Sequence, residues 1–195
     1  MNLNVWHSDR QEMISRARQV LASDMVVYLD TETMGLGSDD EVVEISVVDA
    51  AGAVLFDSLV RPTKPIPPGA TGVHGISDAD VAAAPAFDEI LPALAGALAG
   101  KVVVIYNRAF DLRLLRQSAR ARGVELELGA AKYWCAMEAY AVYYGAWNDY
   151  HGSYTWQQLG NAMRQLKLAL PAELHRARAD AECTRLVVQA MAEGQ

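Results

Sequence analysis

Runs of apolar residues along the chain mark four expected β-strands. Residues 25–30 and 102–106 are nearly continuous apolar runs, the pattern of strands that are covered on both faces. Residues 42–49 and 53–60 form two further expected strands, joined by a tight turn at 51–52. The first of these runs ends abruptly on the acidic sequence Asp-Thr-Glu, which directs attention to the end of that strand.

Between the strands, apolar residues recur at spacings of three and four, which predicts helices. Ser8 and Gln11 have the pattern of a capping box at the start of the first one. The expected helices cover 8–22, a short segment starting at 77, 87–98, 109–122, 131–144, 155–166 and 177–192. The stretch 61–69 contains four prolines and is expected to be a surface loop, because proline removes a backbone donor and fixes φ.

The order of these elements is a helix, three meandering strands, and then alternating helices and strands. This order predicts an α/β three-layer domain with a mixed sheet. A chain of 195 residues is long enough for one domain with a substantial core. We therefore expect a single domain over 1–195, with an N-terminal helix at 8–22 and a catalytic core at about 25–192.

Composition and charge narrow the class of protein. Hydrophobic residues make up 52% of the chain, but no stretch approaches the ~20 uninterrupted apolar residues that a membrane span needs. The N-terminus lacks a secretory signal, and Cys135 and Cys183 are too far apart for a metal-binding spacing, so we expect a cytoplasmic protein with reduced thiols. The net charge of −7 argues against a broad basic surface for duplex DNA, although a pocket that holds a few nucleotides remains compatible with it.

Asp30 and Glu32 stand two residues apart on the first expected strand. Side chains at i and i+2 of a strand point to the same face, so the two carboxylates project side by side. Adjacent negative charges repel strongly unless a positive charge lies between them. A divalent metal ion is the usual solution, and oxygen ligands favour Mg²⁺ or Mn²⁺.

Three further polar residues can complete such a site. Asp111 lies in the first turn of a helix that follows the buried strand at 102–106, where ligand sites of α/β sheets gather. His175 and Asp180 are five residues apart, which on one helix separates them by ~140°. The pair fits one site if His175 lies on a mobile loop ahead of the helix and Asp180 lies on its first turns.

These residues fall into motifs that resemble those of the DEDD-type 3′→5′ exonucleases with a catalytic histidine, a family that includes epsilon proofreading subunits, ribonuclease T and oligoribonuclease. The matching segments are 29–36, 107–111, 175–180 and the loop 73–76, in the family's order over residues 25–190. The resemblance implies a ribonuclease H-like three-layer fold with a central mixed five-stranded sheet. Met34 departs from a commoner threonine, and Tyr106 departs from a frequent histidine; neither position is a metal ligand in the family.

The resemblance implies hydrolysis of phosphodiester bonds with two divalent metal ions. One ion is expected on Asp30, Glu32 and Asp180, and the second on Asp30, with Asp111 acting through water. His175 is expected to deprotonate the attacking water, so that nucleoside 5′-monophosphates leave the 3′ end of single-stranded DNA or RNA. The expected substrate contacts are Thr33, Met34, Gly35, Leu36, His74, Asn107 and Phe110.

Several alternatives remain open at this point. A proofreading subunit of a polymerase is disfavoured because the chain stops soon after the last motif, without a docking tail. A catalytically silent nucleic-acid-binding module is disfavoured because all five catalytic residues are present. DNA and RNA are not distinguished, and a homodimer is compatible with the family. The aromatic-rich segment 133–156 serves either for packing or as a stacking surface, and Arg176 and Arg178 either contact phosphate or are solvated.

Overall fold

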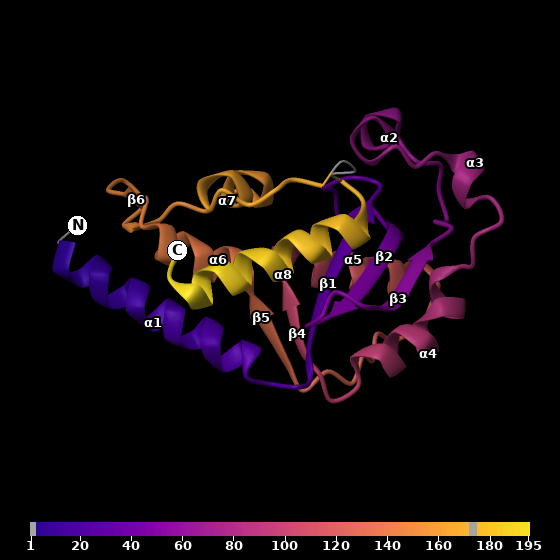
Figure 1. The fold of residues 1–195 in the computed structure, drawn as a ribbon. Helices are drawn as coiled ribbons and strands as arrows, with labels where there is room; N and C mark the ends of the chain where they lie inside the picture. Colours follow the sequence, from indigo (N-terminus) through magenta and orange to yellow (C-terminus); the bar gives the residue numbers. More distant parts are fainter. Residues whose placement is uncertain (1–2, 172–174) are drawn as a thin grey trace.

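A computed structural model describes residues 3–171 and 175–195, with side chains from residue 6 onward. A five-stranded sheet with the order β3-β2-β1-β4-β5 forms its centre (Figure 1). The strands are β1 Val26–Thr33, β2 Val42–Asp49, β3 Val54–Leu59, β4 Val102–Ile105 and β5 Lys132–Cys135. β2 runs antiparallel to β1 and β3, whereas β1, β4 and β5 are parallel, so the sheet is mixed as expected.

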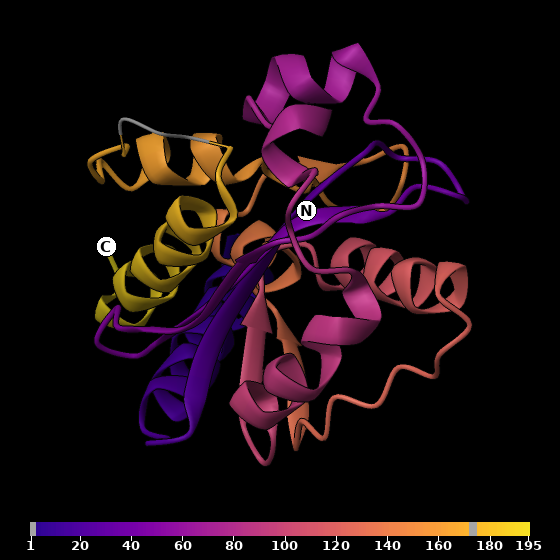
Figure 2. The ribbon, with the colours of Figure 1, turned by 90° about the vertical axis from the view of Figure 1, so that its right-hand side faces the viewer.

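Helices cover both faces of this sheet and make the fold three-layered (Figure 2). One face packs against α1 Leu3–Leu21, α6 Ala136–Tyr144, α7 Leu159–Gln165 and α8 Ala177–Glu193. The other face packs against α4 Phe87–Leu98 and α5 Arg108–Ala121. The short helices α2 Pro68–His74 and α3 Asp78–Val81 lie beyond the β2–β3 side of the sheet, and the small hairpin of β6 Trp147–Asn148 and β7 Ser153–Tyr154 lies toward the other end (Figure 1).

Alternation along β1 decides which face receives its acidic residues. Tyr28 belongs to the apolar cluster on the α8 side, whereas Leu29 belongs to the cluster on the α5 side. Since side chains alternate along a strand, Asp30 and Glu32 follow Tyr28 toward α8, and Thr31 follows Leu29 toward α5. β1 continues to Thr33, so both acids lie within the strand and not beyond its end.

The helix expected at 131–144 was the main error of the sequence interpretation. Its first part is the edge strand β5, which pairs in parallel with β4, and only its remainder is the helix α6. Tyr133 and Trp134 are residue types that favour strands, but four residues are too few to show an alternating pattern. β5 supplies the fifth strand that the family resemblance implied.

Other expected boundaries were shifted. The first helix begins at Leu3, five residues before the expected cap at Ser8. The stretch 61–69 is not wholly irregular, because Pro68 starts α2 at a position where a missing N–H costs nothing. The helix expected at 155–166 is confined to Leu159–Gln165. The predictions for 87–98, 109–122 and 177–192 were confirmed to within one residue at each end.

None of the helices in the described part of the chain has the length and apolar character that a membrane crossing requires. Cys135 and Cys183 are both buried and free.

Candidate active site

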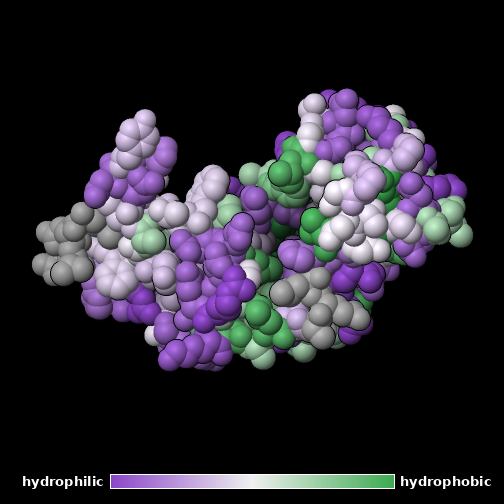
Figure 3. All heavy atoms as spheres, turned by 90° about the horizontal axis from the view of Figure 1, so that it is seen from above, coloured by the Kyte–Doolittle hydropathy of each residue, from purple (hydrophilic) through white to green (hydrophobic). Residues whose placement is uncertain are grey.

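A cavity of about 160 Å³ lies where β1, β4, α5 and α8 meet, and it brings together all five predicted catalytic residues. The space-filling view from above shows a hollow near the middle of this face of the molecule (Figure 3). The residues that line the cavity are Asp30, Thr31, Glu32, Tyr106, Asn107, Phe110, Asp111, Leu159, His175 and Asp180. The cavity therefore joins residues from segments that are far apart in the sequence.

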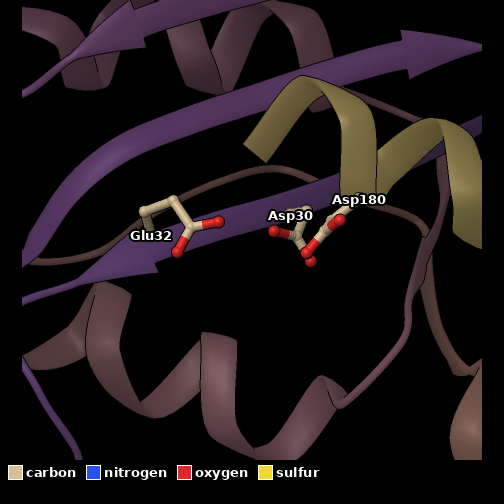
Figure 4. A group of neighbouring side chains, drawn as sticks. All are labelled: Asp30, Glu32 and Asp180. Atoms are coloured by element: carbon tan, nitrogen blue, oxygen red, sulfur yellow. The ribbon is translucent and has the colours of Figure 1, made fainter. Parts of the chain in front are cut away.

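Three carboxylates form the centre of the site. Asp30 and Glu32 project from β1 toward α8, and Asp180 projects from the first turn of α8 to meet them (Figure 4). One oxygen from each of the three lies within 4.8 Å of the others. The spacing that predicted two carboxylates on one face of a strand is thus confirmed, and α8 adds the third.

Asp111 approaches from the opposite face of the sheet. It is buried in the first turn of α5, where its Oδ1 accepts a hydrogen bond of 2.8 Å from the Thr31 hydroxyl. It does not belong to the group of three close carboxylates, but its charge is the largest electrostatic influence on Asp30. Thr31, which the sequence interpretation overlooked, holds this fourth carboxylate in place from the alternate face of β1.

The pKa values of these acids are raised above their usual values. Burial raises the pKa of Asp30 well above its usual value, and the neighbouring acids Asp111, Asp180 and Glu32 raise it further. Burial and the charge of Asp180 raise the pKa of Glu32 to about 8. Burial raises the pKa of Asp111 to about 7, against the opposing hydrogen bond from Thr31. The site therefore lacks positive charge, which protons or cations can supply.

The donor set fits divalent cations. Burial raises the pKa of Asp180, and its Oδ1 is buried without a hydrogen-bond partner among the described residues. A buried carboxylate oxygen without a partner is costly, and a cation coordinated there removes that cost. Carboxylate oxygens in this number are the ligands that Mg²⁺ and Mn²⁺ prefer.

His175 lies directly ahead of α8 and is exposed at the edge of the cavity. Its backbone has a φ of 62°, in the left-handed region that residues other than glycine rarely adopt. The expected loop ahead of it falls on residues 172–174, which lie outside the described residues. Strained backbone of this kind persists only where neighbouring structure enforces it.

Arg176 supplies that neighbouring structure through Glu44, a residue that the sequence interpretation missed. The Arg176 Nε lies 3.1 Å from both carboxylate oxygens of Glu44, and the Ala177 N–H donates to Glu44 Oε2 at 2.8 Å. Glu44 is buried on β2 directly opposite Glu32. The start of α8 is thus fixed to the sheet beside the acidic cluster. The signal for Glu44 in the sequence was an acidic residue inside the largely apolar run 42–48.

The expected substrate contacts divide into three groups. Asn107 and Phe110 line the cavity beside the acids. Met34 and His74 are instead buried, Met34 in an apolar cluster beside Ile76 and His74 with its Nδ1 accepting the Ile76 N–H at 3.0 Å.

The remaining expected contacts are Thr33, the last residue of β1, and Gly35 and Leu36 on the turn that follows it. Leu36 is highly exposed there. A Cβ at Gly35 would come within 2.6 Å of the Asp40 carboxylate, so glycine permits the tight packing of this turn. Contact of Thr33, Gly35 and Leu36 with substrate stays a prediction.

Comparisons with known proteins agree with this geometry. The RNase T family model, described as "Exonuclease", matches residues 27–187. An uncharacterized exonuclease, CP81, of Escherichia phage 186 is 39% identical over 184 residues, which cover 92% of this chain and 93% of the relative. Exodeoxyribonuclease 10 of Escherichia coli K12 is 36% identical over 92 residues, which cover 47% of this chain and 40% of the relative.

Solved structures give the same fold. Exonuclease X in complex with 5′ overhanging duplex DNA has a TM-score of 0.63 at 26% identity, covering 86% of this chain and 91% of that one. The nuclease domain of 3′hExo, a DEDDh family member bound to rAMP, has a TM-score of 0.69 at 15% identity, covering 89% and 94%. With the family model, the phage relative and the acidic site in agreement, the chain belongs to the RNase T family of DEDDh exonucleases.

Proposed function

We propose that this chain removes nucleotides from the 3′ end of single-stranded DNA or RNA and releases nucleoside 5′-monophosphates. The observation that carries the proposal is the convergence of Asp30, Glu32 and Asp180 within 4.8 Å, in a cavity that also contains Asp111 and His175. A cavity of about 160 Å³ suits one terminal phosphodiester and part of its nucleotide better than a duplex. The DNA complex of exonuclease X supports a nucleic acid as the substrate.

The acidic residues would hold two divalent cations, Mg²⁺ or Mn²⁺. Asp30, Glu32 and Asp180 would hold one of them, and Asp30, with Asp111 acting through water, would hold the other. When bound, such cations supply positive charge that stabilises the negative charge on the oxygens of a phosphodiester under attack. The protein residues supply the ligands, the orientation of the terminal nucleotide and the acceptor for a proton.

His175 is the proposed proton acceptor. Its imidazole nitrogen takes a proton from a water molecule, and the water oxygen attacks phosphorus while the bond from phosphorus to the 3′ oxygen breaks. The departing 3′ oxygen takes up a proton from solvent, so the shortened strand ends in a 3′ hydroxyl, and the released nucleotide keeps the phosphate on its 5′ oxygen. The anchoring of Arg176 on Glu44 holds the adjacent His175 at the edge of the cavity.

Digestion of matched DNA and RNA oligonucleotides, labelled at the 5′ end, tests this function. We expect a ladder that shortens from the 3′ end with Mg²⁺ or Mn²⁺ and stops with a chelator. His175→Ala is expected to lower kcat by roughly 10²–10⁴-fold without changing Tm, since a general base contributes about that much. His7→Ala, at an exposed histidine of α1, is the control. Full activity of His175→Ala, or internal cleavage, contradicts the proposal.

A further inference from the structure

Three large aromatic side chains between α6 and α7 are exposed although nearby rings are packed. Tyr150 is 91% exposed, Trp156 is 66% exposed and Trp147 is 37% exposed. By contrast, Tyr140 and Tyr143 are buried against the helices of the α8 side. The aromatic-rich segment therefore divides into a part that packs in the core and a part that stays exposed.

The segment that directly follows Trp156 is tied to the wall of the active-site cavity. The Tyr106 hydroxyl, which belongs to the cavity wall, donates to the Gln157 carbonyl at 2.7 Å. The Gln157 side chain in turn accepts from Gln165 of α7 at 3.0 Å. Leu159, three residues after Trp156, also lines the cavity. The backbone that directly follows this exposed indole is thus tied to the site.

The other two rings continue from Trp156 along the β6–β7 hairpin, which extends away from the site in Figure 1. The Thr155 N–H donates to the Ala146 carbonyl at 2.7 Å and joins the base of the hairpin to the segment before Trp156. Trp147 packs edge-on against Tyr154, with ring centroids 5.2 Å apart. The hairpin therefore presents rings from a braced backbone.

Charge indicates which partner these rings suit. The chain carries a net charge of −7, and the cavity itself is lined by four carboxylates, so a polyanion gains little from general electrostatic attraction. Stacking of bases on aromatic rings needs no surface charge and tolerates any base. Such stacking requires unpaired bases, because bases in a duplex are already stacked on one another.

We propose that Trp156, continued by Tyr150 and Trp147, is a stacking platform for unpaired bases upstream of the 3′-terminal nucleotide. This inference rests on the proposed function, because it assumes that the 3′ end occupies the cavity. It assigns the binding of longer single strands to the segment 147–156 and leaves the chemistry to the acids and His175. Short substrates that end within the cavity do not reach the platform.

The experiment compares Trp156→Ala with the unmodified chain on substrates of two lengths. With the p-nitrophenyl ester of thymidine 5′-monophosphate, we expect equal kcat/KM. With a 20-nucleotide single strand, we expect the KM of Trp156→Ala to be at least fivefold higher at similar kcat. We expect Trp156→Phe to bring KM most of the way back to that of the unmodified chain. Leu55→Ala, at an exposed side chain of the distant edge strand β3, is the matched control.

A binding measurement separates failure of this inference from failure of the proposed function. Fluorescence anisotropy of the labelled 20-nucleotide strand in EDTA reports affinity without turnover, and we expect at least fivefold weaker binding by Trp156→Ala. Equal affinity of the two proteins overturns the platform, whether or not the chain is a nuclease. An equal loss on the short ester and the long strand also overturns it, because that result means that Trp156 only supports the cavity wall.

Discussion

At the scale of single residues, the acidic cluster holds carboxylates close together although their charges repel one another. Four carboxylates line one small cavity, and burial raises the pKa of each of them. Neighbouring carboxylates raise the pKa of Asp30, Glu32 and Asp180 further. Residue types and spacing predicted Asp30 and Glu32 because a period of two determines the face. The contribution of Thr31 could not be predicted, since its hydrogen bond to Asp111 depends on how α5 lies against β1.

Asp30→Asn tests this repulsion in the metal-free protein. Glu32 has its pKa raised from 4.5 to about 8, so between these pH values the folded protein binds more protons than the unfolded chain, and stability falls as pH rises. Burial and the neighbouring acids also raise the pKa of Asp30 well above its usual value, so removing this carboxyl group removes its own contribution to the fall and flattens it. Each tenfold change in the proton affinity of a group changes the free energy of unfolding by ~1.4 kcal/mol, which corresponds to roughly 3–6 °C in Tm at pH 8.

Thermal melts in EDTA from pH 5.5 to 8.5 measure the effect. The Tm of the unmodified chain is expected to fall as pH rises across this range. The Tm of Asp30→Asn is expected to fall less, and this variant is expected to have no nuclease activity. Asp57→Asn, at an exposed carboxylate of β3, is expected to follow the unmodified chain. Identical profiles of Tm against pH for the unmodified chain and Asp30→Asn would show that the Asp30 carboxylate does not destabilise the metal-free protein.

At the scale of elements, the site depends on how α8 is fixed to the sheet. Long periodic segments such as α4, α5 and α8 were predictable from the sequence because their apolar stripes extend over several turns. β5 was not, because its four residues gain their strand conformation from pairing with β4. The ion pair of Arg176 with Glu44 was not predictable either, since it links a loop to a strand far away in the chain.

Glu44→Gln is expected to loosen the start of α8 and misplace Asp180 and His175. A misplacement of ~1 Å can cost about 10²-fold in rate, so we expect kcat to fall at least tenfold. We also expect weaker Mn²⁺ binding by calorimetry. The Arg176 side chain is 42% exposed and stays hydrated, so the loss of stability should remain below the ~3–5 kcal/mol of a fully buried broken pair.

Glu182→Gln is the matched control for this prediction. Glu182 also forms an ion pair on α8, with Arg185, but it does not line the cavity. We expect this variant to keep its activity and its Mn²⁺ affinity. If Glu44→Gln lowers Tm as much as expected but leaves kcat and Mn²⁺ affinity unchanged, then the Glu44–Arg176 pair only stabilises the fold and does not position the site.

At the scale of the whole molecule, the acidic cluster connects the two ends of the chain. Asp30 and Glu32 come from the first strand and Asp180 from the last helix, and α8 also packs along α1 (Figure 1). A cation bound among these three residues holds β1 and α8 together and is lost when the chain unfolds. Binding of metal at the site must therefore stabilise the entire fold.

Thermal melts with increasing Mn²⁺ measure this coupling directly. At a free concentration of 100 times Kd, one bound ion adds ~2.7 kcal/mol, which for a chain of this size corresponds to roughly 5–11 °C in Tm. Asp180→Asn removes the ligand from α8 and is expected to abolish most of the shift, whereas Asp57→Asn keeps it. NaCl at matched ionic strength excludes general screening. A full Mn²⁺ shift in Asp180→Asn would mean that the ion binds elsewhere and that α8 contributes no ligand.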